Sequence, residues 1–245
     1  MVDRLYADPS LAELYDAACA GREDFDFYLP LVLAAASVLD VGCGTGELLR
    51  RAREAGHAGR LCGVDPAAAM LDVARRGRGD VEWVEGDLAS VAWSSPFELV
   101  VMTGHAFQVL VDDDEIRAAL AAVGAALADD GRFVFETRNP RVRAWEHWTR
   151  AHTVEFVAPD GTVVRKTSEV THPVDGDVVR FSQTYAGARW DRPQVSRSTL
   201  RFLDEPALAS VLGDAGLTIE AQFGDWAGRP LTDTSPEIIT VTRRR

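Results

Sequence analysis

The chain has 245 residues, of which 47% are hydrophobic and 26% charged, the balance of a folded globular protein. Its formal net charge of −12 opposes nucleic-acid binding, because phosphate contacts need clustered lysine and arginine. No apolar run approaches the roughly eighteen residues of a membrane span, and the N-terminus lacks the apolar core of a signal peptide. The composition therefore predicts a cytoplasmic protein that binds neither nucleic acid nor membrane.

The three cysteines, Cys19, Cys43 and Cys62, form no CxxC motif and no cluster with histidine. Such spacing predicts neither a disulfide framework nor a zinc site, and no metal is expected.

Residues 1–35 are expected to form a helical cap, with two helices over residues 10–35. From residue 36 to residue 137, short apolar runs alternate with helical patterns, which predicts a parallel sheet covered on both faces. The expected strands are Ser37–Val41, Arg60–Val64, Val81–Glu85, Phe97–Met102 and Arg132–Glu136. The helices between them include Gly46–Ala55, Ala67–Arg76 and Asp113–Ala128.

The pattern changes at Pro140. Residues 140–150 are expected to be helical, and residues 151–203 contain turn signals between β-rich runs, which predicts an antiparallel insertion. Its seven basic residues can face an acidic substrate or solvent, and we favour solvent. A helix follows, and two final strands near Thr218–Phe223 and Ile238–Thr242 are expected to form a hairpin at the sheet edge.

A glycine-rich turn follows the first strand, in the run VLDVGCGTGELL. Gly42, Gly44 and Gly46 carry no Cβ, so a ligand can approach the backbone closely. Ligands of such sheets bind at the carboxyl ends of the strands. Asp65 ends the second strand, where a carboxylate can accept hydrogen bonds from both ribose hydroxyls. Asp87 follows the third strand and is expected at the same sheet edge as Asp65. These positions predict an adenosine-containing ligand.

A dinucleotide is the rival ligand. Its fingerprint is G-x-G-x-x-G, whereas this turn reads G-x-G-x-G and places Glu47 where the last glycine belongs. A pyrophosphate would meet that acid at a helix N-terminus, so a cationic sulfonium nucleoside suits the turn better.

Four motifs, VLDVGCGTG, VDPAAAMLDVA, EGDLASV and FELVVMTGHAFQVL, follow one another in the chain. In order and spacing they resemble the class I S-adenosylmethionine-dependent methyltransferases over residues 36–137 and the final hairpin. The resemblance implies an α/β Rossmann-like, doubly wound, mostly parallel seven-stranded sheet with a C-terminal antiparallel hairpin strand. Residues 36–150 and 204–245 would form this domain, and residues 151–203 an antiparallel β lid.

The resemblance also implies S-adenosyl-L-methionine as cofactor, S-adenosyl-L-homocysteine as product, and a set of cofactor-binding residues. The set comprises Tyr15 closing over the cofactor, Asp40, Gly42, Cys43, Gly44 and Gly46 at the methionine end, Asp65 and Pro66 at the ribose, Met70, Asp87 and Leu88 at the adenine, and Thr103 and Gly104 near the amino group.

Catalytic candidates follow the fourth strand. His105 can act as a general base or orient the acceptor, and Gln108 lies in the same loop. The alternative for His105 is a side chain hydrogen-bonded to loop backbone. Beyond the fifth strand, Arg138, Trp145 and Trp148 are candidates for an acceptor pocket, although two tryptophans three residues apart on a helix also pack well in a core.

The acidic run Asp112–Glu115 suggests a metal site, but consecutive side chains splay apart, and acids at this point cap a helix. We therefore favour capping. The insertion presents an antiparallel edge, through which two copies of the chain can form a homodimer.

Taken together, the residues predict methyl transfer to an O or N atom of a small-molecule acceptor such as a natural product, a sugar amine or a metabolite. The alternatives are an RNA or protein methyltransferase, and a non-methylating protein that keeps the cofactor.

Overall fold

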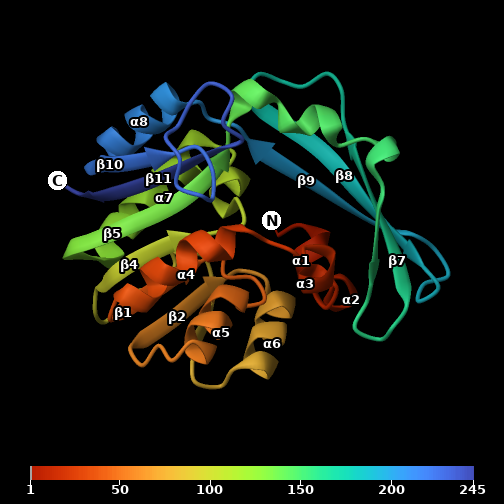
Figure 1. Ribbon diagram of the computed structural model, residues 1–245, viewed down its shortest axis with the longest axis horizontal. Coiled ribbons are helices and arrows are strands. Elements are labelled where there is room, and N and C mark those ends of the chain that lie inside the picture. The colour runs from red at the N-terminus through yellow and green to blue at the C-terminus, as the bar shows by residue number, and fades with distance from the viewer. Residues whose placement is uncertain (1) are drawn as a thin grey trace.

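The computed structural model describes residues 2–245 and contains two sheets (Figure 1). The larger sheet has seven strands in the order β10-β11-β5-β4-β1-β2-β3. Its strands are β1 (Ser37–Val41), β2 (Arg60–Asp65), β3 (Glu82–Glu85), β4 (Phe97–Met102), β5 (Leu127–Arg138), β10 (Leu217–Phe223) and β11 (Glu237–Arg244). The smaller sheet consists of β6 (Val154–Val157), β7 (Val163–Val170), β8 (Val178–Gly187) and β9 (Gln194–Arg201).

The larger sheet is parallel from β3 to β5, and β11 alone lies antiparallel between β5 and β10. The Rossmann-like fold is thereby confirmed, with the C-terminal hairpin at the sheet edge. All five expected central strands are present, and β5 is longer at both ends than the expected Arg132–Glu136. Parallel strands need crossovers, and helices supply them on both faces.

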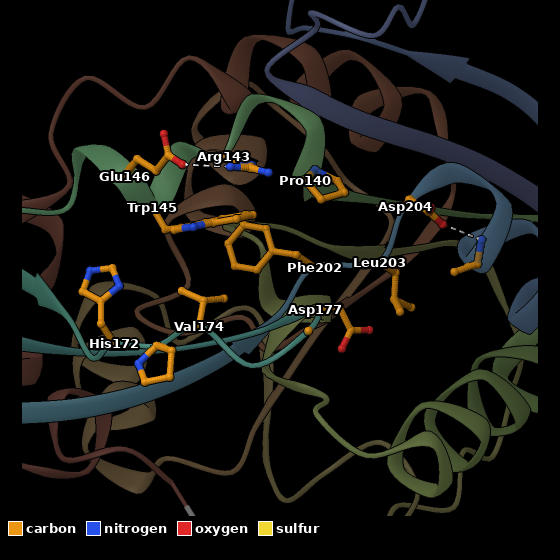
Figure 2. Close-up of a pocket in the computed structure, with 13 residues that line it drawn as sticks. Pro140, Arg143, Trp145, Glu146, His172, Val174, Asp177, Phe202, Leu203 and Asp204 are labelled. Carbon is orange, nitrogen blue, oxygen red and sulfur yellow. Dashed lines mark hydrogen bonds and ion pairs between the residues drawn. The ribbon is translucent and has the colours of Figure 1, made fainter.

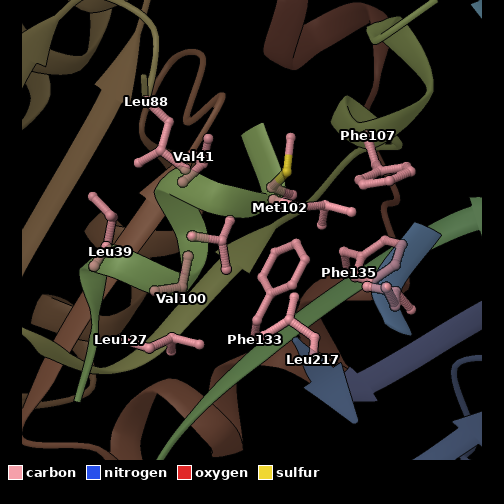
Figure 3. Close-up of a cluster of buried hydrophobic side chains, with 14 of the residues drawn as sticks. Leu39, Val41, Leu88, Val100, Met102, Phe107, Leu127, Phe133, Phe135 and Leu217 are labelled. Carbon is pink, nitrogen blue, oxygen red and sulfur yellow. The ribbon is translucent and has the colours of Figure 1, made fainter. Parts of the chain in front are cut away.

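Helices cover both faces of this sheet. The longer ones are α4 (Asp24–Ala34), α5 (Glu47–Glu54), α6 (Ala68–Gly77), α7 (Asp113–Ala126) and α8 (Glu205–Asp214). One face packs Leu39, Val100 and Phe133 against α7 and α8 (Figure 3). The other packs Val38 and Val101 against α4 and α5. Burial on both faces explains why the strands are continuous apolar runs.

Two expected elements are wrong in detail. Residues 10–35 contain α4 and two single-turn helices, α2 (Pro9–Ala12) and α3 (Tyr15–Ala18), after a further turn α1 (Arg4–Ala7). Residues 140–150 form no α-helix but the 3₁₀ turns Pro140–Val142, Ala144–His147 and Arg150–His152. Arg143 adopts a left-handed φ of +46°, which interrupts a right-handed helix after its first turn.

The antiparallel insertion is confirmed as a four-stranded sheet, which we call the lid sheet. Figure 1 shows α1, α2 and α3 between the lid sheet and the larger sheet. Leu5, Leu11 and Tyr185 join the N-terminal turns to the lid in one apolar cluster. The face of the lid sheet opposite this cluster carries Arg165 and other exposed arginines, as favoured from the sequence. Within residues 2–245, no helix has the length and apolarity needed to cross a membrane.

Candidate functional site

The glycine turn joins β1 to α5 in left-handed backbone conformations. Gly42, Gly44 and Gly46 have φ values of +70°, +56° and +75°. The turn is held by the Gly42 amide, which donates to the Val64 carbonyl at 2.8 Å, and by the Gly44 amide, which donates to the Asp65 carboxylate at 2.8 Å. Residues with a Cβ avoid this region, so glycine is required for the turn itself as well as for close approach of a ligand.

Asp40 is the buried acid of this turn, with 1% of its surface exposed. Its Oδ1 atom has no hydrogen-bond partner among the described residues. Burial raises the pKa of the Asp40 carboxyl to about 7, against the opposing charge of Arg22. A buried carboxylate oxygen without a partner is costly, so the site favours a cationic ligand group here.

A cavity of about 30 Å³ lies in front of Asp40. Its lining includes the expected Tyr15, Gly42, Cys43, Gly44 and Thr103, and also Arg22, Phe25, Thr45, Glu47 and Leu48. The structure thus brings the predicted methionine-end residues together, with Tyr15 arriving from the N-terminal turns. Gly46 does not line the cavity, because it packs against the ring of Trp83.

Sequence reasoning missed Arg22. Its guanidinium lies 4.2 Å from the centroid of the Phe25 ring, forms an ion pair with Asp24, and lies beside Gly104. It is a cation in the same cavity as Asp40. No local pattern marks it among the 26 basic residues, because its position depends on how α4 packs on the sheet.

The nucleoside side of the site lies at the ends of β2 and β3. Asp65 accepts from the Gly44 and Ala67 amides at 2.8 Å each, which leaves further lone pairs on both carboxylate oxygens. Met70 is buried with Ala67 and next to Tyr15. Pro66 lies between Asp65 and Ala67 and begins the approach to α6. This arrangement puts a carboxylate and a thioether beside the glycine turn.

Asp87 is exposed, and its carboxylate accepts from the Ser90 amide at 2.8 Å. Asp87 is therefore a turn residue, while its predicted contact with adenine stays a prediction. Leu88 next to it is buried in the core cluster shared with Val41.

His105 follows β4 and has a left-handed φ of +62°. Its amide donates to the Glu136 carboxylate at 2.7 Å, and its Nε2 lies 2.9 Å from Oε2 of Glu237. The imidazole therefore contacts a carboxylate of β11 rather than loop backbone. Burial, aided by the charge of Arg138, lowers the pKa of His105 to about 3, and burial raises the pKa of Glu237 to about 8.

Glu136 lies beneath this loop at the end of β5, fully buried. It accepts hydrogen bonds from the Tyr28 hydroxyl and from the His105 amide. Burial raises the pKa of Glu136. The sequence analysis missed Glu136 and Glu237, although an acid at the end of a buried strand is a signal that could have found Glu136.

Gln108 is buried with both ends of its amide engaged. Its Oε1 accepts from Arg138 at 3.0 Å, and its Nε2 donates to the Arg201 carbonyl at 3.1 Å. Gln108 thus orients Arg138 within the chain, and a direct part in the reaction stays a prediction.

The two tryptophans have different surroundings. Trp148 packs on Phe181 with ring centroids 4.8 Å apart and lies under the Arg138 guanidinium. Trp145 packs on Phe202 at 4.6 Å and lines a separate open cavity of about 740 Å³ (Figure 2). That cavity shares no lining residue with the one at the glycine turn.

The acidic run before α7 forms a capping box. The Asp112 side chain accepts from the backbone of Glu115, and the Glu115 side chain accepts from the Asp112 amide. The acids thus stabilise the start of a helix, as favoured from the sequence.

By sequence, the chain matches known methyltransferases. Residues 38–131 match the model of a methyltransferase domain. The cypemycin N-terminal methyltransferase of a Streptomyces species is 28% identical over 85% of this chain and 83% of its own length. The dTDP-3-amino-3,6-dideoxy-alpha-D-glucopyranose N,N-dimethyltransferase of Streptomyces fradiae is 29% identical over 95% and 93%.

Solved structures resemble the whole fold, including the lid. The CcbJ methyltransferase from Streptomyces caelestis superposes with a TM-score of 0.78 at 20% identity, covering 98% of both chains. CalS10 from Micromonospora echinaspora, an amino pentose methyltransferase solved with SAM bound, has a TM-score of 0.70 at 25% identity, covering 95% of this chain and 97% of that one. Residues 38–131 carry a methyltransferase domain, and the chain is an S-adenosylmethionine-dependent methyltransferase with the class I fold.

Proposed function

We propose that the chain transfers a methyl group from S-adenosylmethionine to an N or O atom of a small molecule. The observation that carries the proposal is the buried Oδ1 of Asp40 beside the glycine turn, which has no hydrogen-bond partner within residues 2–245. The names of the relatives support the class of acceptor, since two of them act on an amino sugar or an amino pentose.

The described residues fit this cofactor. Asp40 would accept from its ammonium group, Arg22 would bind its carboxylate, and Asp65 would accept from the ribose hydroxyls. Met70 and Leu88 would pack near the adenine, and Asp87 would accept from its amino group. The glycine turn leaves backbone amides accessible beside these groups.

The cofactor supplies a methyl group on a sulfonium, which leaves as a neutral sulfide. The protein's task is therefore alignment, exclusion of water and removal of the acceptor's proton. When Glu237 is ionised it accepts from Nε2–H of His105, which leaves Nδ1 free to take that proton. The cytoplasmic location and the pairing of two copies through the lid edge stay predictions.

Titration calorimetry with S-adenosylhomocysteine and with NAD⁺ tests the proposal. We expect heat with the first and none with the second, and a loss of affinity of about tenfold or more in Asp40→Asn, since a hydrogen bond to a charged group contributes about 1.5–3 kcal/mol. Asp72→Asn, an exposed acid of α6, is the matched control. Binding of NAD⁺ in place of the sulfur nucleoside would refute the proposal. Formation of S-adenosylhomocysteine with amino-sugar acceptors then identifies the substrate.

A further inference from the structure

Arg138 is unusual among the arginines that lie away from the surface. Within residues 2–245 no carboxylate lies within 4.0 Å of its guanidinium, and the partner of its NH1 is the neutral amide oxygen of Gln108. Other partly buried arginines, such as Arg22 and Arg201, have carboxylate partners. In the described part of the chain, three further arginines lack an ion pair, but all three are exposed: Arg192, Arg197 and Arg245. A partly buried guanidinium without an anion is costly.

The carboxylate best placed to pair with Arg138 is that of Glu237, but it contacts a different residue. Glu237 lies directly opposite Arg138 in the register of β5 and β11, where side chains share a face and opposite charges attract. Its carboxyl is instead 2.9 Å from His105. Burial raises the pKa of Glu237 to about 8 despite the charge of Arg138, which weakens this carboxyl as a counter-charge for Arg138. Within residues 2–245 the guanidinium of Arg138 thus has no carboxylate in contact, and Glu237 and Glu136 act on it only from beyond 4.0 Å.

Two aromatic side chains lie near this charge. The guanidinium lies 5.3 Å from the Trp148 ring centroid, and its charge acts on the hydroxyl of Tyr6, whose pKa burial raises to about 12. That hydroxyl has no hydrogen-bond partner among the described side chains. The Tyr6 and Tyr15 rings lie 6.0 Å apart, and Tyr15 lines the cavity at the glycine turn. Arg138 itself lies opposite Glu237 and therefore beside His105, the predicted base.

We propose that Arg138 and Tyr6 bind an oxyanion, a carboxylate or a phosphate, that the methyl acceptor carries in addition to its nucleophilic atom. The planar guanidinium offers paired N–H donors that match either group, and Gln108 and Trp148 hold its plane in place. This inference rests on the proposed function and specifies the acceptor as anionic.

Anion titration at constant ionic strength tests it, with acetate and inorganic phosphate as probes and chloride as the balancing salt. Tryptophan fluorescence is the readout, because Trp148 lies beneath the guanidinium. We expect saturable binding of at least one probe by the wild type, with and without S-adenosylhomocysteine. Saturation by acetate alone identifies a carboxylate, and saturation by phosphate a phosphate.

Variants assign the binding to Arg138. Arg138→Gln should weaken anion binding about tenfold or more. Arg138→Lys should weaken it less, because it keeps the positive charge but loses the paired N–H donors of the guanidinium. Tyr6→Phe should weaken it about threefold. Arg141→Gln, an exposed arginine of the same segment, should bind as the wild type does. Circular dichroism and S-adenosylhomocysteine affinity check that each variant folds.

Two outcomes overturn the inference: neither probe saturates the wild type, or Arg138→Gln binds as tightly as the wild type. If Arg138→Gln does not fold, Arg138→Lys and Tyr6→Phe decide by the same criterion. Failure of the anions with normal S-adenosylhomocysteine binding rejects this inference alone, whereas failure of the nucleoside to bind rejects the proposed function.

Discussion

At the scale of single residues, the site is a set of buried ionisable groups whose pKa values or pairing are unusual. Within residues 2–245, Oδ1 of Asp40 has no hydrogen-bond partner and the guanidinium of Arg138 has no carboxylate within 4.0 Å. Glu237 and His105 face one another with pKa values displaced by burial in opposite directions. Such groups cost stability in the free protein, and their persistence is typical of sites that bind charged ligands.

The first prediction concerns Asp40. Its folded pKa of about 7 lies above its usual 3.8, so ionisation opposes folding, and stability from this group is present at low pH and lost as pH rises toward 7. Asp40→Asn should therefore melt above the wild type by a margin that grows from pH 5 to pH 8, because most of the loss between 3.8 and about 7 falls above pH 5. Thermal melts of both proteins across this range measure the difference, and a constant difference would contradict the assignment.

The second prediction concerns Glu237. Its carboxyl lies 2.9 Å from the His105 imidazole. The charge of Arg138, opposite it on β5, lowers the pKa of Glu237, and the charge of Asp24 of α4 raises it. Because His105 can act as a base when Glu237 is ionised, kcat should rise with pH through about 8. In Glu237→Gln this rise should disappear and kcat should fall about tenfold or more. Steady-state kinetics from pH 6 to 9 measure the profile, and an unchanged rise in the variant would assign it to another group.

At the scale of elements, the glycines of the turn both allow β3 to pack closely and leave the backbone open to a ligand. A Cβ at Gly46 would lie 2.3 Å from the Trp83 ring of β3, in a backbone with φ of +75°. Gly46→Ala should lower the free energy of unfolding by about 2–4 kcal/mol, combining left-handed strain with displacement of the ring.

Urea denaturation measures this loss, and Gly56→Ala is the matched control. Gly56 has φ of +92° but no atom within 4 Å of its Cβ position, so it reports strain alone, about 1–2 kcal/mol. Equal losses in both variants would show that contact with Trp83 adds nothing.

At the scale of the whole molecule, the N-terminal turns join the two sheets. Leu11 is fully buried with Leu14 and Tyr185, between α2 and the lid sheet. Leu11→Ala should cost about 2–5 kcal/mol of stability. Because Tyr6 and Tyr15 lie on the same turns, it should also raise the KM of the acceptor, once identified, more than the Kd of S-adenosylhomocysteine.

Leu120→Ala is the control for this prediction, since Leu120 is equally buried but lies on α7 in the main core. Hydrogen exchange followed by mass spectrometry should show faster exchange over residues 4–18 in Leu11→Ala only. Equal acceleration in both variants would mean that the turns open with the whole domain.

Much of the fold was predictable, because its causes are local. Apolar runs end at Val41 and Met102 as expected, and acids cap α7 where the acidic run begins. The segment after Pro140 was wrong as a helix, because a left-handed residue at Arg143 carries no signature in composition.

The sequence by itself determined the parallel sheet, the glycine turn and the acids that end β1 and β2, because side-chain period and backbone conformation are local properties. Only the tertiary structure decided which distant charges meet. Glu237 reaches His105, 132 residues away, because β11 inserts antiparallel beside β5 and brings it to the same sheet edge. Arg22 reaches the turn because α4 packs on the sheet. Among the described residues no carboxylate contacts Arg138, because Glu237 contacts His105 instead. Charge pairing of this kind depends on register and packing, which one stretch of sequence does not encode.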